Sequence, residues 1–383
     1  MNRLHRLHHD ERGMSFVFVG MGFMAFMAAT TLAIDIGMLM TARTQAQTAA
    51  DSAALAGALA LAFDDYDNRT STGPAVQNAI QTAKVNDVMQ ADVDIDPEDV
   101  TFPVGPTGLS NRVKANVYRT AARENAVDLL MGRFLKILDK ADISATATAE
   151  ASQANAMTCV KPFTIPDKWI EAQTPPWDEN DTFEMYDNKG NLLPNPDVYY
   201  DADQANHTGY DPELDKGRRL MIRAGTGNNI EPSAYFSYAM GGVTGSDEYG
   251  DNIENCNTLK MRFKELILME PGNMVGKTVD GLDNLIAKDP NAWWNESTMK
   301  PVSTMNPSPR VVIIPVYDPV YYSEGKRNGR FADLRVANYI GFFIDERVGN
   351  NVYGYITPVT GIYNGNAGPA PINAFPYAIR LVE

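Results

Sequence analysis

The stretch that decides the fold is MSFVFVGMGFMAFMAATTLAI, which runs from Met14 to Ile34 and contains no charged residue. At a rise of about 1.5 Å per residue, a helix of this length spans roughly the 30 Å hydrocarbon core of a bilayer. The sequence therefore predicts a transmembrane helix over 14–34. A cleaved signal peptide is the alternative, because Thr31-Leu32-Ala33 forms a small-x-small site, although the apolar stretch exceeds the usual core of about 7–15 residues.

Positive charges lie on one side of this stretch. Arg3, Arg6 and Arg12 precede it, and the first cation after it is Arg43. Because the flank with more cations stays in the cytosol, we expect a cytosolic basic segment over 1–13 and an exported body. The predicted location is a bacterial inner membrane, crossed once, with the body in the periplasm or at the cell surface.

Helix-forming residues continue beyond the apolar stretch. MLMTARTQAQTAADSAALAGALALAF, from Met38 to Phe63, has no Pro and one Gly. This composition favours a helix, so we expect an exported stalk over 35–63 that is continuous with the transmembrane helix. The residues at helical spacing that we expect to bury one face of the stalk are Leu55, Ala58, Leu59 and Ala62.

The rest of the chain is predicted to be α+β in two parts, because its composition changes near residue 150. Only four of the 23 Pro come before that point, whereas all four Trp and both Cys come after it. We expect a small helix-plus-antiparallel-sheet unit over 64–155 and a larger β-rich exported domain over 156–383. The predicted helices are Pro74–Met89, Asn125–Leu138, Leu259–Met269 and Leu282–Lys288. The predicted strands are Val100–Phe102, Val113–Tyr118, Ala141–Ala149, Val311–Tyr317, Tyr339–Ile344, Val352–Ile356 and Tyr377–Val382.

Charge and cysteine content limit the possible functions. The formal charge of −15 repels phosphate backbones, so nucleic-acid binding is not expected. Cys159 and Cys256 are too few and too far apart for a zinc site. In an exported body they can form one disulfide, and the alternative is two buried free thiols.

An acidic stretch is the one candidate metal site. From Asp178 to Asp215 there are 11 carboxylates and one cation other than His207, among Asn, Gly and Pro. Oxygen-rich loops of this kind can bind calcium, with Asp201, Asp203 and Asp211 as candidate ligands, and the alternative is a hydrated acidic loop. No other cofactor is expected. His207 is the one histidine of the predicted exported body and has no Gly-x-Ser-x-Gly sequence with it, so we do not expect an enzyme.

The order of motifs near the N-terminal end resembles a known family. Arg12-Gly13, the apolar span, AIDIG from Ala33 to Gly37, Arg43 and AADSAALAGA from Ala49 to Ala58 follow one another. This series resembles the N-terminal segment of the tight-adherence (Tad) family, the TadE/TadG-like proteins of Flp pilus assembly. The resemblance implies that the 64–155 unit is pilin-like and that Arg12, Gly13, Asp35, Gly37 and Arg43 act in membrane insertion or assembly. Asp35 is expected at the outer membrane boundary, hydrated or paired with a neighbouring subunit.

The resemblance also implies a function. It predicts a membrane-anchored TadG-like structural or assembly component of an adhesive pilus, with other Tad/Flp proteins as partners. Prepilins carry Glu five residues after the cleaved Gly, and Phe18 stands at that position after Gly13, which favours an assembly role over polymerisation. The alternative is a membrane-tethered binding module that recognises a surface or sugar through its tryptophans. These are Trp169, Trp177, Trp293 and Trp294.

Overall fold

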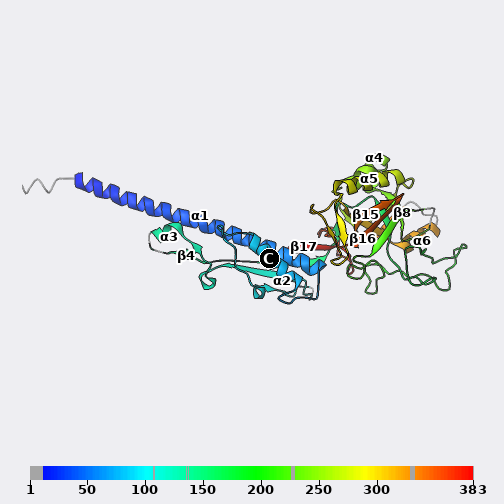
Figure 1. Cartoon of the computed structure of the whole chain (residues 1–383), viewed down its shortest axis with the longest axis horizontal. Helices are drawn as coiled ribbons and strands as arrows, with labels where there is room; N and C mark the ends of the chain where they lie inside the picture. The colour runs from blue at the N-terminus through cyan, green and yellow to red at the C-terminus, as the bar shows by residue number, and fades with distance from the viewer. Residues whose placement is uncertain are drawn as a thin grey trace, which may run out of the picture. The chain divides into compact units, whose positions relative to one another are not determined.

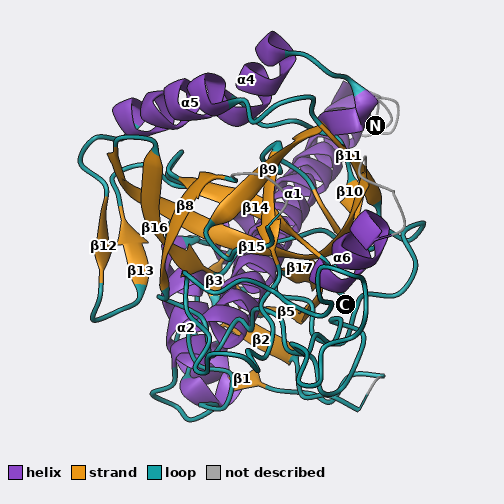
Figure 2. Ribbon diagram, turned by 90° about the vertical axis from the view of Figure 1, so that its right-hand side faces the viewer, coloured by secondary structure: helices purple, strands orange, loops and turns teal. Residues whose placement is uncertain are grey.

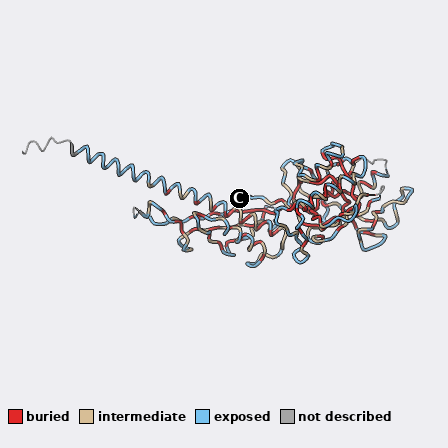
Figure 3. The backbone as a smooth tube through the Cα atoms, turned by 45° about the horizontal axis from the view of Figure 1, so that its top comes forward, coloured by how far each residue is buried: buried red, intermediate tan, exposed pale blue. Residues whose placement is uncertain are grey.

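The N-terminal helix is a single element. In the computed structural model, which describes residues 12–106, 108–134, 136, 138–225, 229–327 and 333–382, helix α1 runs without interruption from Arg12 to Phe63 (Figure 1). The predicted span and stalk are thus one rod of 52 residues. Figure 3 shows that α1 is exposed along its first part and buried on one side along its last part. Most of the predicted cytosolic segment, including Arg3 and Arg6, lies outside the described residues.

The buried face of α1 is made of small residues. We expected Leu55 and Leu59 to face the core, but Leu55 is half-buried and Leu59 is 43% exposed. The face is instead lined by alanines at helical spacing, together with Gly57 and Leu61. The buried alanines are Ala42, Ala46, Ala49, Ala50, Ala53, Ala54, Ala58 and Ala60.

Small residues are needed here because the neighbouring elements approach α1 closely. A Cβ added to Gly57 would lie 2.7 Å from Cγ1 of Val113 and 3.2 Å from Cβ of Ala79. Polar contacts join the same surfaces: the Met89 amide donates to Oε1 of Gln45 over 2.8 Å, and Nε2 of Gln47 donates to the Thr146 carbonyl over 3.2 Å. A side chain as large as leucine would not fit on this face, because the neighbouring elements are close-packed against it.

A small antiparallel sheet and two helices complete the first unit. Its sheet has the order β1-β2-β5-β17, and β2 pairs with β5 along its whole length. The elements are α2 (Pro74–Val85), the 3₁₀ helices η2 (Pro97–Asp99) and η3 (Ala121–Arg123), β1 (Val100–Thr101), β2 (Arg112–Arg119), β3 (Val127–Asp128), α3 (Leu130–Phe134), β4 (Lys140–Ala141) and β5 (Ile143–Gln153). The predicted helix over Asn125–Leu138 is wrong. Its first residues form β3, which pairs with β4, and α3 is only five residues long.

The second unit is built on a ring of strands. Pairings run β15-β14-β7-β9-β8-β16 and close when β16 pairs with β15, while β11 pairs with both β15 and β9. The β14–β7 and β8–β9 pairs are parallel and the others are antiparallel. The strands are β6 (Ala156–Met157), β7 (Phe163–Pro166), β8 (Arg219–Ala224), β9 (Ala234–Ala239), β10 (Met261–Arg262), β11 (Leu266–Met269), β12 (Trp293–Asn295), β13 (Lys300–Val302), β14 (Val311–Tyr317), β15 (Asp333–Val348) and β16 (Asn351–Thr357). Strand β17 (Tyr377–Leu381) instead pairs with β5 in the four-stranded sheet.

Helices pack on the ring (Figure 2). Tyr249 and Ile253 of α4 and Leu282 and Leu285 of α5 share one apolar core with the strands. The helical elements are η4 (Met240–Gly242), α4 (Ser246–Glu254), α5 (Val275–Lys288) and α6 (Pro319–Arg327).

The predicted helix over Leu259–Met269 is wrong. Lys264 has a φ of +62°, which interrupts a helix, and Leu266–Met269 pairs as β11. The many strands that follow α1 confirm the predicted α+β class with a β-rich second part.

The chain divides into two compact units. One runs to Ala151 and includes the chain again from Arg380, and the other is Ser152–Ile379. Within the first unit, Nη2 of Arg380 donates to Oε1 of Glu150 over 3.1 Å. The sequence had placed the division at 155/156 and the chain end in the second domain.

The close approach at Gly57 can be tested by adding one methyl group. We expect Gly57→Ala to lower the free energy of unfolding by about 1–3 kcal/mol, because the new Cβ overlaps Val113 and the Ala75 carbonyl. The matched control is Gly37→Ala in the same helix, where a Cβ meets nothing within 4 Å. The control should be neutral or stabilising through helix propensity. Thermal unfolding of the full chain in detergent measures both, and equal effects would contradict the packing described.

Candidate functional site on the N-terminal helix

The first part of α1 presents an apolar surface that none of the other described residues covers. Its most apolar 18-residue stretch has a mean hydropathy of 2.0, and none of that stretch is buried. Large side chains are exposed on all sides of the helix. They include Phe16, Phe18, Phe23, Met24 and Phe26, each at least 64% exposed. By length and composition this helix can cross a membrane.

Asp35 is paired within the chain. The carboxylate is 8% exposed and accepts hydrogen bonds from the amides of Met131 (3.0 Å) and Gly132 (2.6 Å) in α3. We had expected a carboxylate that is hydrated or bound to another subunit. The structure instead uses Asp35 to attach the β3–α3–β4 hairpin to α1 immediately after the apolar stretch.

The other residues of the motif series are spread along α1. Gly37 and Arg43 are exposed, and nothing lies within 4 Å of a Cβ placed on Gly37. Arg12 and Gly13 form the first turn of α1. The structure therefore does not bring these residues together into one site. Their common property is their position on a single helix.

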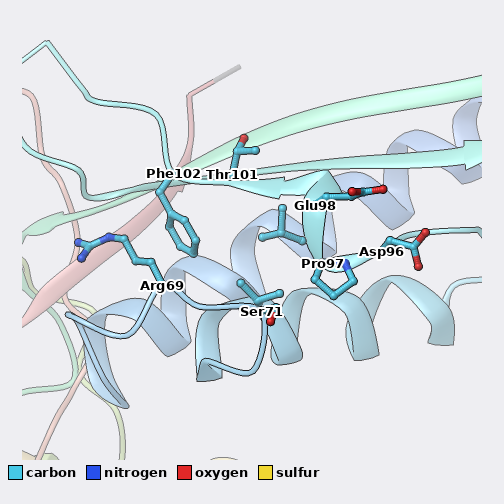
Figure 4. A pocket seen from close by; sticks show the side chains of 9 residues that line it. Arg69, Ser71, Asp96, Pro97, Glu98, Thr101 and Phe102 are labelled. Atoms are coloured by element: carbon cyan, nitrogen blue, oxygen red, sulfur yellow. The ribbon is translucent and has the colours of Figure 1, made fainter.

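An open hollow of about 730 Å³ lies beside β1 in the first unit (Figure 4). Arg69 lies at one end, with its guanidinium 4.6 Å from the ring of Tyr66 and Nη2 donating to the Ser110 carbonyl over 3.0 Å. Asp96 and Glu98 lie at the other end. β1 is the edge of its sheet, but it has two residues and follows Pro97, so it offers little backbone for strand addition.

Cys159 and Cys256 form a disulfide in the second unit. The same two segments are joined by a hydrogen bond from the Cys159 amide to the Asn257 carbonyl (2.8 Å) and by Nζ of Lys161, which donates to the Asn255 carbonyl (3.2 Å). Burial lowers the pKa of Lys161 to about 8. The bridge connects residues 97 positions apart, and disulfides closing long loops restrict the unfolded chain most.

The three candidate calcium ligands have other partners. Asp201 and Asp203 both lie beside Nζ of Lys264, at 3.7 Å for Asp201. Asp211 accepts from the amides of Glu213 (2.8 Å) and Leu214 (2.9 Å) within its own loop. Among the residues that the structure describes, no group of three or more His, Cys, Asp or Glu is placed to hold a metal ion. Calcium binding stays a prediction without support from this geometry.

The acidic stretch is organised by carboxylates that are buried. Asp197 accepts from the amides of Ala172 (2.8 Å) and Glu184 (2.7 Å). Asp215 accepts from Nζ of Lys168 (2.8 Å) and Nε of Arg218 (2.7 Å). Both side chains are nearly inaccessible. These acidic residues therefore fold the loop, and the description as a hydrated loop is incomplete.

Asp167 is as deeply buried as these groups. Its Oδ1 accepts from the amides of Lys168 and Tyr210, each over 2.9 Å, and its Oδ2 accepts from the Tyr199 hydroxyl over 3.1 Å. Burial raises the pKa of Asp167 to about 7, because loss of water disfavours the carboxylate more than these hydrogen bonds favour it. Burial likewise raises the pKa of Asp197 to about 6.

The tryptophans do not form a shared platform. Trp169 is buried, and Trp177 packs edge-on against it at 5.9 Å. Trp293 and Trp294 are adjacent in a strand, so they point to opposite faces. Trp294 is 7% exposed and stacks on Tyr355 at 4.8 Å, while Trp293 is 52% exposed. The two side chains therefore do not form one surface on which a ligand could stack.

His207 lies in the acidic stretch. Its Nε2 is 3.9 Å from Oδ2 of Asp211. Burial lowers the pKa of the imidazole more than Asp211 raises it.

These features define a class of protein: a chain with one helix long and apolar enough to cross a membrane, continued as the central helix of a small α+β unit. Residues 13–60 match the family described as "Tad: Putative Flp pilus-assembly TadE/G-like". The match confirms the resemblance and covers the apolar span, AIDIG and AADSAALAGA. This segment connects the chain with Flp pilus assembly, a structural rather than an enzymatic family role. No curated protein and no solved structure matches the chain.

The sequence did not reveal two buried carboxylates, Asp35 and Asp167, or the groups that they contact. Asp35 meets amides 96 and 97 residues away, and no local pattern indicates this contact. Asp167 lies outside the acidic stretch that we had singled out. Only the structure shows its surroundings, where a Cβ on Gly209 would lie 2.4 Å from Oδ2 of Asp167.

The buried Asp167 predicts a pH dependence with a definite sign. Its folded pKa of about 7 exceeds the ordinary value of 3.8, so its stabilising contribution is complete below pH 3.8 and is lost as pH rises through 7. We expect Asp167→Asn to flatten the fall in unfolding free energy across this range. An amide retains the acceptor for Lys168 and Tyr210 and can donate to Tyr199.

The control for this experiment is Asp187→Asn. Hydrogen bonds from Asn191 lower the pKa of the exposed Asp187. Asp187 therefore changes the free energy of unfolding only at pH values below 3.8, and its replacement should leave the pH dependence above pH 3.8 unchanged. Urea unfolding at a series of pH values measures both variants. If the pH dependence of the free energy of unfolding is unchanged in Asp167→Asn, the Asp167 carboxyl is not its cause.

Proposed function

We propose that the chain is a membrane-anchored, TadG-like structural or assembly component of a Flp-type adhesive pilus. Its helix crosses the bacterial inner membrane once over Met14–Ile34, with the N-terminus in the cytosol and the body exported. The observation that carries this proposal is the apolar part of α1, which is long enough to span a bilayer and is not covered by any other part of the chain that the structure describes. Leaving so many aromatic and methionine side chains in water would be unfavourable.

Charge and cysteine chemistry support the orientation. Arg12 and the earlier arginines precede the span, whereas the next cation is Arg43. The disulfide of the second unit forms and persists in oxidising compartments, as the periplasm is. Both features favour an exported body.

The structure of α1 supports an assembly role over a polymerising one. Phe18 stands where prepilins carry Glu, and its side chain is 64% exposed on the apolar surface. The alanine face beyond Ala42 is already covered by α2 and β2. The chain therefore uses its family segment to join an anchor to its own folded unit.

The anchor is tested by fractionation and protease protection of the full chain. We expect it to stay in the membrane pellet after high-salt washing, and to be digested only when protease reaches the periplasmic side. The double variant Met24→Arg, Met27→Arg should move it to the soluble fraction, since each charge costs about 3 kcal/mol near the helix centre. Thr44→Arg, beyond the span on an exposed position, is the matched control.

Two outcomes would contradict the proposal. Complete release of the unaltered protein by high salt would show that α1 does not anchor it. Digestion from the cytosolic side alone would show that the body is not exported. Deletion of the gene with unchanged pili and adhesion would instead favour a tethered binding module.

A further inference from the structure

The hairpin that meets Asp35 has an amphipathic end. β3 and β4 pair at Val127↔Ala141 and Asp128↔Lys140, and α3 lies between them. We call the described residues 129–134, 136 and 138–140 the hairpin tip. Leu130 is 57% exposed and Leu138 is 55% exposed, although most large apolar side chains of this unit outside α1 are buried.

Cations surround these leucines. Arg133, Lys136 and Lys140 are all exposed. The carboxylates near them are Asp139 and Asp128, and Asp128 lies 3.9 Å from Nζ of Lys140. The tip thus has three cations and one carboxylate, Asp139, in a chain of net charge −15, and Asp128 lies directly before it. Exposed leucines among cations are typical of segments that lie in the interface of a membrane with anionic lipids.

The position of the tip along α1 is fixed by two hydrogen bonds. Asp35 accepts from Met131 and Gly132 directly after the apolar span ends at Ile34. Gly132 permits this approach, because a Cβ there would lie 2.4 Å from the Leu138 carbonyl oxygen and 3.4 Å from Oδ2 of Asp35. The apolar surface of α1 continues past this point at Ile36 and Met40, which are 47% and 68% exposed.

We propose that the hairpin tip is a second membrane contact, in which Leu130 and Leu138 enter the outer headgroup region and Arg133, Lys136 and Lys140 meet anionic lipid headgroups. The occupant is the lipid surface because the tip continues the surface of a helix that ends its span at the same level. The inference rests on the proposed membrane anchoring of α1. Asp35 is then covered by the tip at the boundary where a free carboxylate would meet lipid.

The test places an environment-sensitive fluorophore on single new cysteines of the full chain, whose native cysteines are joined in a disulfide. The protein is reconstituted in vesicles of phosphatidylcholine and phosphatidylglycerol. Label positions are Leu138→Cys in the tip, Phe26→Cys in the span, and Val104→Cys as an exposed apolar control in the same unit. Leu130→Cys provides a second tip position.

Each position has its own expected result. Labels at 138 and 130 should show blue-shifted emission, quenching by headgroup spin-labelled lipids, and several-fold less quenching by iodide than the label at 104. Arg133→Gln with Lys136→Gln should reduce the blue shift at 138. Phosphatidylcholine vesicles without phosphatidylglycerol should reduce it in the same way.

The outcomes separate this inference from the anchor. A label at 138 that behaves like 104, while 26 is in the bilayer, overturns the tip contact and leaves the anchor intact. Protection from iodide without lipid quenching means that protein covers the tip, which also overturns it. A water-exposed label at 26 shows instead that the anchoring proposal has failed.

Discussion

The structure depends on one helix that must satisfy two environments. Up to Ile34, α1 has large apolar side chains on every side, which suits lipid and no protein surface. From Ala42 onward one face carries alanines, which suits close contact with α2 and β2. Because the helix is continuous from Arg12 to Phe63, its exposed apolar part and the part that packs in the first unit are one rigid element.

The boundary between these two parts of α1 lies at Asp35. Asp35 is the first charged residue after the span, and it is buried against the amides of α3. At the end of a membrane span, an unpaired carboxylate would be unfavourable if lipid surrounded it. The hydrogen bonds remove that conflict and fix the hairpin at the end of the span. Thus the AIDIG motif has a structural role in this chain that its residue types alone do not reveal.

Much of this arrangement could be predicted from sequence, and the failures have clear causes. Length and lack of charge predicted the span, and helix propensity predicted its continuation to Phe63. The buried face of α1 was predicted wrongly because large apolar residues such as Leu59 were expected to be buried. The close approach of Val113 instead requires small residues, Gly57 and the alanines, on that face. The helix expected near Leu266 is a strand because tertiary pairing with β15 overrides local propensity.

The candidate sites of the second unit followed the same pattern. Composition identified an acidic stretch, but it could not show that Asp197 and Asp215 point inward and accept hydrogen bonds. The paired tryptophans were separated by strand geometry, which sends Trp294 into the core. In both cases the residue types were correct and their directions were unknown.

The central claim, that α1 passes without interruption from lipid into the protein core, is tested most directly by cysteine accessibility along the helix. Single cysteines from Met14 to Leu61 would be treated with a membrane-impermeant maleimide in the reconstituted chain. The account predicts no modification over 14–34. Beyond Met40, it predicts protection at Ala42, Ala46, Ala49 and Ala53 and reaction at Thr44, Gln47 and Thr48. Modification throughout 14–34, or equal reaction on every side beyond Met40, would contradict it.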